Sequence, residues 1–221
     1  MVKRFYKIVL ILSLVAFCNN IEAQEDFDFI KYNPKSKFGL RLGAGISAVR
    51  GGNFQKPTPY FGYAAGFYHH GRIKKRSYFY YELSARFKGS NFNTNPDSNT
   101  YSKLALFYTE LPLAYMYRLG KDEEKPFFLM AGGGGGLLVK SSMLLGPNPI
   151  PKHFDLPLKT GELFVMTGFH KYFGSVGLQL NAKWGLTDIN RNNWAGFEDV
   201  KPSPDQKKPI KNWSIEFALI F

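Results

Sequence analysis

The chain has 221 residues, one cysteine and a formal net charge of +12, a length that suits one domain of the larger all-β kind. Aromatic residues make up 17% of it, yet the mean hydropathy is −0.24. After the N-terminal segment no apolar run is long enough for a membrane-spanning helix, which excludes a helical membrane protein. The lone cysteine excludes a disulfide scaffold.

Residues 1–23 have the pattern of a cleaved export signal. The segment opens with three basic residues, Lys3, Arg4 and Lys7. The apolar run from Ile8 to Cys18 that follows is about half as long as the roughly twenty residues that a membrane helix needs. Ala23 is small enough to precede a cleavage point, so we expect the mature chain to begin at Gln24.

Cys18 leaves open a second interpretation, a lipid-attachment site. Phe17 stands before it, where lipoprotein processing requires a small residue, so we favour cleavage after Ala23 and loss of the only cysteine. Cleavage removes three positive charges and Glu22, which takes +12 to +10. Such a charge favours anionic partners. An exported chain meets them as outer membrane lipids and lipopolysaccharide rather than as nucleic acid.

Eight segments of the mature chain alternate apolar with polar or small side chains, the period of β-strands that cross a bilayer. In the third segment Phe79, Leu83 and Phe87 share one face, while Glu82 and Arg86 share the other. The segments are Phe38–Arg50, Tyr60–His69, Tyr78–Lys88, Lys103–Arg118, Phe127–Lys140, Glu162–Phe173, Val176–Thr187 and Ile210–Phe221.

The connections alternate in length, as expected for a barrel that the chain enters from the periplasm. The long connections are residues 51–59, 89–102, 141–161 and 188–209, and the short ones are 70–77, 119–126 and 174–175. We predict a signal peptide over 1–23, a periplasmic lead over 24–37 and an all-β, eight-stranded antiparallel up-and-down transmembrane barrel over 38–221. A soluble ligand-binding barrel is the alternative, but a face carrying arginine, lysine and glutamate is unsuited to line an apolar cup.

Inward charges are the main candidate site. Eight strands enclose a space that side chains can fill, so we expect these charges to neutralise one another as a polar plug. Arg86 should lie near Glu110, and Lys183 or Arg41 near Glu216. The predicted cluster is Arg41, Glu82, Arg86, Glu110, Lys183 and Glu216. An ion or proton path is the alternative.

The last strand ends in alternating hydrophobic residues that should face outward. They are Trp213, Ile215, Phe217, Leu219 and Phe221. This ending resembles the signal by which the barrel-assembly machinery recognises its clients. An ordinary last strand, ending where the barrel closes, is the alternative.

Catalytic and metal sites have little support in the sequence. His69 and His70 are adjacent and would point to opposite faces of a strand, and His153 with Asp155 fits a solvated loop. We assign no catalytic, cofactor-binding or metal-ligating residue and expect no cofactor. The run Gly132–Gly136 lacks the residues of a phosphate-binding loop and suits a strand that must curve around a filled lumen.

From the fourth segment onward the chain resembles the PorT-like outer membrane β-barrel family. The matching stretches are Tyr108–Arg118, Pro126–Gly132 and Gly185–Ile189, and Glu110–Leu113 is the most specific of them. The resemblance implies a barrel in the outer membrane, and its eponymous member is associated with protein secretion. We interpret Pro112 as the site of a bulge, because proline cannot donate to a strand ladder.

Three functional hypotheses follow. We favour a non-enzymatic outer membrane barrel that acts as a structural or interaction component, linked to protein secretion or surface assembly. The rivals are a barrel enzyme that acts on lipid A or peptides, and a small transporter or channel. Proline and aromatic residues in the predicted outer loops would suit binding, or a stiffened surface that faces lipopolysaccharide.

Overall fold

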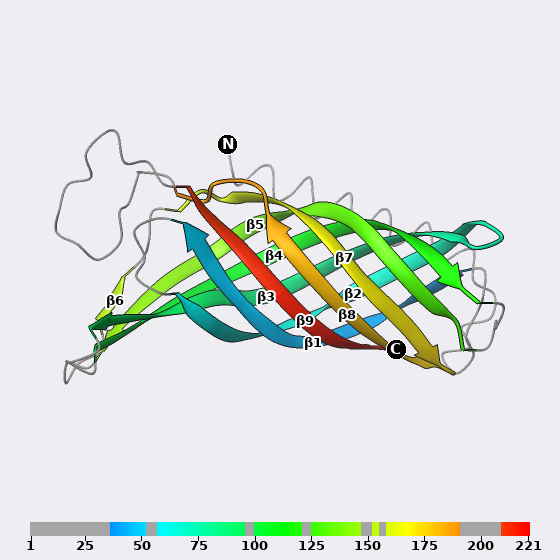
Figure 1. Ribbon diagram of the computed structural model, residues 1–221, viewed down its shortest axis with the longest axis horizontal. Coiled ribbons are helices and arrows are strands. Elements are labelled where there is room, and N and C mark those ends of the chain that lie inside the picture. The colour runs from blue at the N-terminus through cyan, green and yellow to red at the C-terminus, as the bar shows by residue number, and fades with distance from the viewer. Residues whose placement is uncertain are drawn as a thin grey trace. The chain divides into compact units, whose positions relative to one another are not determined.

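Eight strands of the computed structural model pair into a closed ring (Figure 1). The structure describes residues 36–51, 57–95, 100–120, 125–146, 152–154, 158–190 and 209–221. The ring strands are β1 (Ser36–Gly51), β2 (Thr58–Lys74), β3 (Ser77–Asn95), β4 (Thr100–Leu119), β5 (Phe127–Gly146), β7 (Gly161–Phe173), β8 (Val176–Gly185) and β9 (Ile210–Ile220). A three-residue strand, β6 (Lys152–Phe154), pairs with the far end of β5.

Closure of the ring follows from the pairing of the first strand with the last. β1 pairs with β2 on one side and β9 on the other, β4 pairs with β5, and all pairings are antiparallel. The predicted eight-stranded antiparallel barrel is confirmed. Within the described ranges no helix is long and apolar enough to cross a membrane.

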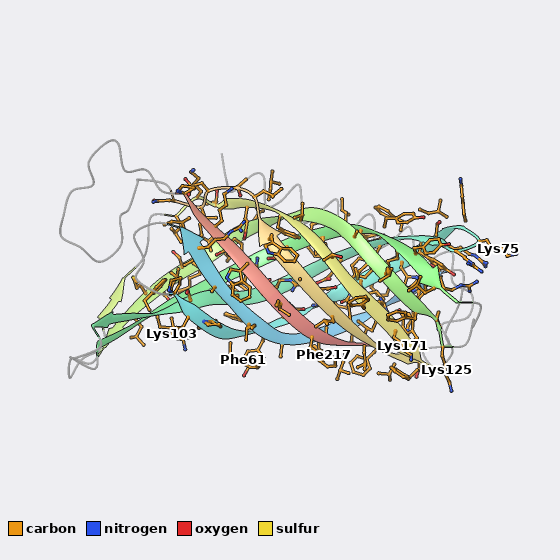
Figure 2. All side chains as sticks on the ribbon, viewed as in Figure 1. Phe61, Lys75, Lys103, Lys125, Lys171 and Phe217 are labelled. Atoms are coloured by element: carbon orange, nitrogen blue, oxygen red, sulfur yellow. The ribbon has the colours of Figure 1, made fainter. Side chains whose placement is uncertain are left out.

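The two ends of the barrel differ in their connections. We call the short-turn end the one where Lys75–Arg76, residues 120–126 and Gly174–Ser175 join strands, and where β1 begins and β9 ends. The long-loop end lies opposite and carries β6. Basic side chains lie at both ends: Figure 2 shows Lys75, Lys125 and Lys171 at the short-turn end and Lys103 toward the other.

The outer wall of the barrel is apolar. Phe61 is 56% exposed, Tyr63 62% and Phe217 50%, and Figure 2 shows Phe61 and Phe217 pointing away from the barrel. In water such a surface would be an aggregation hazard. A closed barrel with an apolar, aromatic-rich wall between basic ends is the architecture of bacterial outer membrane proteins. The protein is located in the cell outer membrane.

Several strands are longer than the alternation indicates. β1 begins at Ser36, two residues inside the predicted 24–37 lead, and the signal segment lies outside the described residues. β3 reaches Asn95 and β4 begins at Thr100, so most of the predicted 89–102 loop is strand. The asparagine-rich sequence indicates a turn, but Phe92, Leu104 and Leu106 are buried in the barrel, and this packing extends the strands.

Pro112 does not produce the predicted bulge. It pairs in register with Gly134, and the register shift between β4 and β5 lies instead between Phe107 and Tyr108. Beside Pro112 two residue pairs are missing from the β3–β4 ladder, yet the register is the same before and after the gap. The missing N–H therefore interrupts hydrogen bonding to one neighbour without bending the strand pairing.

The glycine run lies opposite Pro112, where β4 and β5 approach closely. A Cβ atom on Gly134 would clash with the carbonyl oxygen of Leu111 and lie 2.8 Å from Cζ of Phe164, which fills the lumen at this level. At Gly135, which faces the other way, the nearest atom to a Cβ is 3.8 Å away. The inward glycines of the run make room for the neighbouring backbone and a lumen ring.

We predict that Gly134→Ala destabilises the barrel by about 1–3 kcal/mol, because the added methyl group overpacks the lumen. Gly135→Ala is the matched control and should stay close to wild type. The measurement is urea unfolding in detergent micelles. Gel migration is the readout, because the unfolded barrel migrates more slowly, as it does after boiling. Equal urea midpoints for the two variants would contradict the assignment of Gly134 to the lumen face and Gly135 to the outer face.

Candidate functional site

The lumen is filled by three successive layers of side chains. The short-turn layer is aromatic and methionine-rich and includes His70 and His170. Its apolar members are Tyr68, Tyr78, Tyr80, Ala114, Met116, Phe128, Met130, Phe164, Met166, Tyr172 and Ile220. Phe164 and Met166 reach the level of the charge layer, where the ammonium of Lys183 lies 4.8 Å from the centre of the Phe164 ring. The charge layer contains Arg41, Glu82, Arg86, Lys88, Glu110, Glu162, Lys183 and Glu216, all buried. The long-loop layer is apolar, with Val49, Phe92, Leu104, Leu106, Tyr108, Leu138, Met143, Leu158, Ile189 and Ile210.

Arg86 is the centre of the charge layer. Its Nη2 lies 2.6 Å from Oε1 of Glu82 and its Nε lies 2.8 Å from Oε2 of Glu110. Its Nη1 donates to Glu216, which comes from the last strand. One guanidinium from β3 thus joins carboxylates of β3, β4 and β9 across the barrel.

Arg41 and Lys183 complete the centre of the layer. Arg41 pairs with Glu216 and lies 3.5 Å from Glu82, while its Nε also donates to Oε1 of Gln179 at 2.5 Å. The ammonium of Lys183 lies 2.7 Å from Oε2 of Glu110. These contacts bring β1 and β8 into the same network.

Lys88 extends the network toward the long-loop end. It pairs with Glu110 and lies 3.3 Å from Oε2 of Glu162 on β7. Its ammonium also lies 4.9 Å from the centre of the Tyr108 ring, a cation–π contact. The charged layer therefore merges with the aromatic edge of the apolar layer above it.

The layer contains four basic and four acidic side chains. Buried ions lose hydration, and this loss is compensated only where partners are close and well oriented. A balanced, multiply bonded set meets that condition, whereas removal of any one member leaves an uncompensated charge. Physically, the layer is suited to block the lumen and to tie distant strands together.

The six residues of the predicted cluster all face the lumen and all belong to this network. Arg86 lies beside Glu110, and Arg41 rather than Lys183 pairs with Glu216. Sequence reasoning missed Lys88 and Glu162 as members. Lys88 shares a face with Glu82 and Arg86, and Glu162 alternates with the outward Leu163, so the same period-two pattern contains the signal for both.

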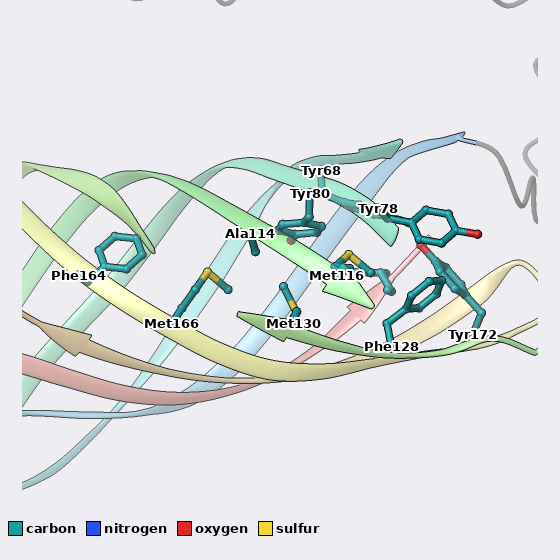
Figure 3. Close-up of a cluster of buried hydrophobic side chains, with 11 residues drawn as sticks. Tyr68, Tyr78, Tyr80, Ala114, Met116, Phe128, Met130, Phe164, Met166 and Tyr172 are labelled. Atoms are coloured by element: carbon teal, nitrogen blue, oxygen red, sulfur yellow. The ribbon is translucent and has the colours of Figure 1, made fainter. Parts of the chain in front are cut away.

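The short-turn layer brings two histidines together from distant positions. His70 on β2 and His170 on β7 are fully buried, with ring centres 6.1 Å apart. Nε2 of His70 lies 3.1 Å from the Tyr172 hydroxyl, which lies 3.0 Å from that of Tyr68. Figure 3 shows Tyr78, Phe128 and Tyr172 grouped at one end of this layer. Across the described residues, no cluster of three or more histidine, cysteine or acidic residues could hold a metal ion.

Asp188 organises the rim at the long-loop end. Its Oδ1 accepts hydrogen bonds from the amides of Asn190 at 3.0 Å and Ile210 at 2.8 Å, and Lys159 lies 3.4 Å from Oδ2. Partial burial acts to raise the pKa of Asp188, but these donors outweigh it and hold the pKa below its usual value of 3.8. The carboxylate thus fixes the chain where it leaves β8 and where it enters β9.

The hydrophobic residues of the last strand face outward. Ile215, Phe217, Leu219 and Phe221 are 42%, 50%, 40% and 41% exposed, and Trp213 is half-buried. Between them Ser214, Glu216, Ala218 and Ile220 face the lumen. The backbone of Phe221 exchanges two hydrogen bonds with Leu40 of β1. Phe221 therefore lies at the seam where the first and last strands meet.

Comparison with known proteins finds likeness in structure only. Neither a protein-family model nor a curated protein matches the sequence. Neisserial surface protein A is 10% identical with a TM-score of 0.43, and the alignment covers 84% of this chain and 97% of that one. Ail of Yersinia pestis is 9% identical with a TM-score of 0.38 over 85% and 99%. AlkL, an outer membrane protein, is 10% identical with a TM-score of 0.36 over 90% and 96%.

Replacement of Arg86 by methionine should destabilise the barrel by about 3–5 kcal/mol, because three buried carboxylates lose a partner at once. Adding Glu216→Gln to this variant restores the balance of charge and should recover part of the loss. Urea unfolding in micelles measures both effects. Lys140→Met removes an exposed cation and serves as the control, within about 0.5 kcal/mol of wild type. An Arg86→Met barrel as stable as this control would show that the layer does not stabilise the fold.

Replacement of Asp188 by alanine should speed hydrogen exchange at the Ile210 amide roughly fivefold, since a hydrogen bond to a partly exposed group contributes about 1 kcal/mol. Asp188→Asn keeps an acceptor oxygen, so its exchange rate at Ile210 should lie between those of the wild type and the alanine variant. Because the folded-state pKa is lowered, this contribution is present above pH 3.8 and is lost as the pH falls through the folded value. Exchange at Ile210 that is unchanged in the alanine variant would rule out this role.

Proposed function

We propose that the protein is a non-enzymatic structural or interaction component of the outer membrane, acting through its long-loop end as a subunit of a secretion or surface-assembly complex. The observation that carries the proposal is the balanced charge layer across the lumen. A barrel whose interior is filled by mutually neutralised side chains offers no wide path for a solute. Its remaining surfaces for partners are its two ends and its wall.

The long-loop end is the better candidate for a protein partner. Binding residues in proteins are concentrated on loops that a rigid scaffold positions. Here β6 extends the sheet beyond the start of β7, and Asp188 fixes both ends of the last connection. The short-turn end instead joins its strands by brief turns such as Lys75–Arg76 and Gly174–Ser175.

The resemblance to PorT-like barrels supports the secretion link. Its most specific element, Glu110–Leu113, has a defined place in this barrel: Glu110 bonds Arg86, Lys88 and Lys183 in the plug. Such an element would preserve a closed lumen in a barrel that serves a larger assembly. The outward apolar side chains of the last strand, among them Ile215, Phe217 and Leu219, support a second partner, the barrel-assembly machinery, during biogenesis.

Site-specific photo-crosslinking in intact cells tests the proposal. Probes replace Lys140 and Lys159 toward the long-loop end, and Lys75 and Lys171 at the short-turn end provide matched exposed controls. The expected result is a discrete adduct from the first pair alone, with a component of a secretion or surface-assembly complex identified by mass spectrometry. Adducts from the control pair alone would overturn the proposal. An absence of adducts together with altered lipid A in a deletion strain would favour an enzyme instead.

A further inference from the structure

Two basic side chains face each other on the outer wall near the long-loop end. Arg50 of β1 pairs directly with Lys211 of β9 in the strand register. Arg50 follows the outward Leu42 and Ile46 at even spacing, and Lys211 precedes the outward Trp213 and Ile215 in the same way. Like charges directly opposite on one face of a sheet are destabilising, so this pair is unfavourable in the bare protein.

Within the described part of the chain, no acidic side chain relieves this repulsion. Neither Arg50 nor Lys211 lies within salt-bridge distance of a described carboxylate. The Nη2 of Arg50 donates instead to the carbonyl oxygen of Gly185 at 3.3 Å. Figure 1 shows β9 between β1 and β8. Because Gly185 belongs to β8, the bond from Arg50 crosses β9, the strand that carries Lys211. The Arg50 guanidinium is thus held over β9, the strand of Lys211, and has further N–H donors beyond this one bond.

Two tryptophans lie next to the cations. Trp184 of β8 pairs directly with Trp213 of β9, two residues along the strand from Lys211. Trp184 is 41% exposed, and tryptophan is enriched where a membrane meets water. We call these four residues, Arg50, Lys211, Trp184 and Trp213, the Arg50–Lys211 patch.

The patch lies one membrane thickness from the opposite edge of the wall. Phe221 is at the short-turn end of β9, and a tilted strand rises roughly 2.5 Å per residue along the barrel axis. The ten-residue interval from Phe221 to Lys211 therefore spans about 25 Å, the height of the apolar band of such barrels. Lys211 and Arg50 are at the level of lipid headgroups at the long-loop end.

We infer that the Arg50–Lys211 patch binds a phosphate group of an outer-leaflet lipid, namely the phosphorylated lipid A part of lipopolysaccharide. A guanidinium binds phosphate oxygens in a forked arrangement, and the ammonium adds a point charge. The phosphate supplies the counter-charge that no described carboxylate provides to Arg50 and Lys211, while the two indole rings contact the sugar and the first acyl carbons. This site lies on the wall and goes beyond the proposed function, which concerns a protein partner at the loops.

Titration of the refolded mature chain in a neutral detergent tests the site. The probes are bisphosphorylated lipid A and the same lipid A after enzymatic removal of its phosphates, with tryptophan fluorescence and native mass spectrometry as readouts. The wild type should prefer the phosphorylated lipid. In the Arg50→Gln/Lys211→Gln variant the affinity for it should fall about tenfold or more, as expected for loss of two charge-assisted contacts.

The matched control is Lys140→Gln/Lys171→Gln, which removes the same charge from exposed positions elsewhere and should bind as wild type does. In lipid-free detergent the Arg50→Gln/Lys211→Gln variant should unfold at no lower urea concentration than wild type, because a repulsion has been removed. Unchanged lipid A affinity in that variant would overturn the inference. So would an equal loss in the control, or displacement of lipid A by an equal concentration of inorganic phosphate.

Discussion

The narrow interior of an eight-stranded barrel is the constraint on which the rest of the structure depends. Such a lumen is just wide enough for side chains, so an inward charge has no bulk water to solvate it. The protein meets this constraint with opposite charges from neighbouring and facing strands. Arg86 joins carboxylates of three strands, and Lys88 and Lys183 share Glu110. Because the partners come from six ring strands, the network also links the two halves of the sheet.

The layers on either side of the network depend on the same constraint. Aromatic rings and methionines close the short-turn end, and an apolar layer closes the other. Because side chains of the described strands fill the lumen at these levels, we propose that recognition by this barrel takes place at its exterior. The proposed partner at the long-loop end is a protein, and the proposed ligand of the Arg50–Lys211 patch on the wall is a lipid phosphate. The two proposals have separate tests, so they stand or fall independently.

Period-two alternation predicted the strand number, the antiparallel closure and which face of each strand is inward. It also predicted the six lumen residues of the cluster, since burial of a strand face is a local property of the sequence. It also led to Arg86 near Glu110 and to Arg41 as one of two candidates for Glu216, and both contacts are present. It did not predict the contact that Arg86 of β3 makes with Glu216 of β9, because these strands are not neighbours. The approach of His70 to His170, one hundred positions apart in the chain, depends on closure. The bulge predicted at Pro112 was wrong because the N–H that proline lacks leaves only a gap in the β3–β4 ladder.

Electrical recording from the refolded wild-type barrel in planar bilayers tests the plugged lumen most directly. A wide porin refolded in the same detergent and lipid provides the positive control. The balanced charge layer predicts a baseline without steady openings on the nanosiemens scale. Steady openings of that size, lost on heat unfolding of the same preparation, would contradict the closed lumen. They would also contradict the proposal that the protein acts through its exterior.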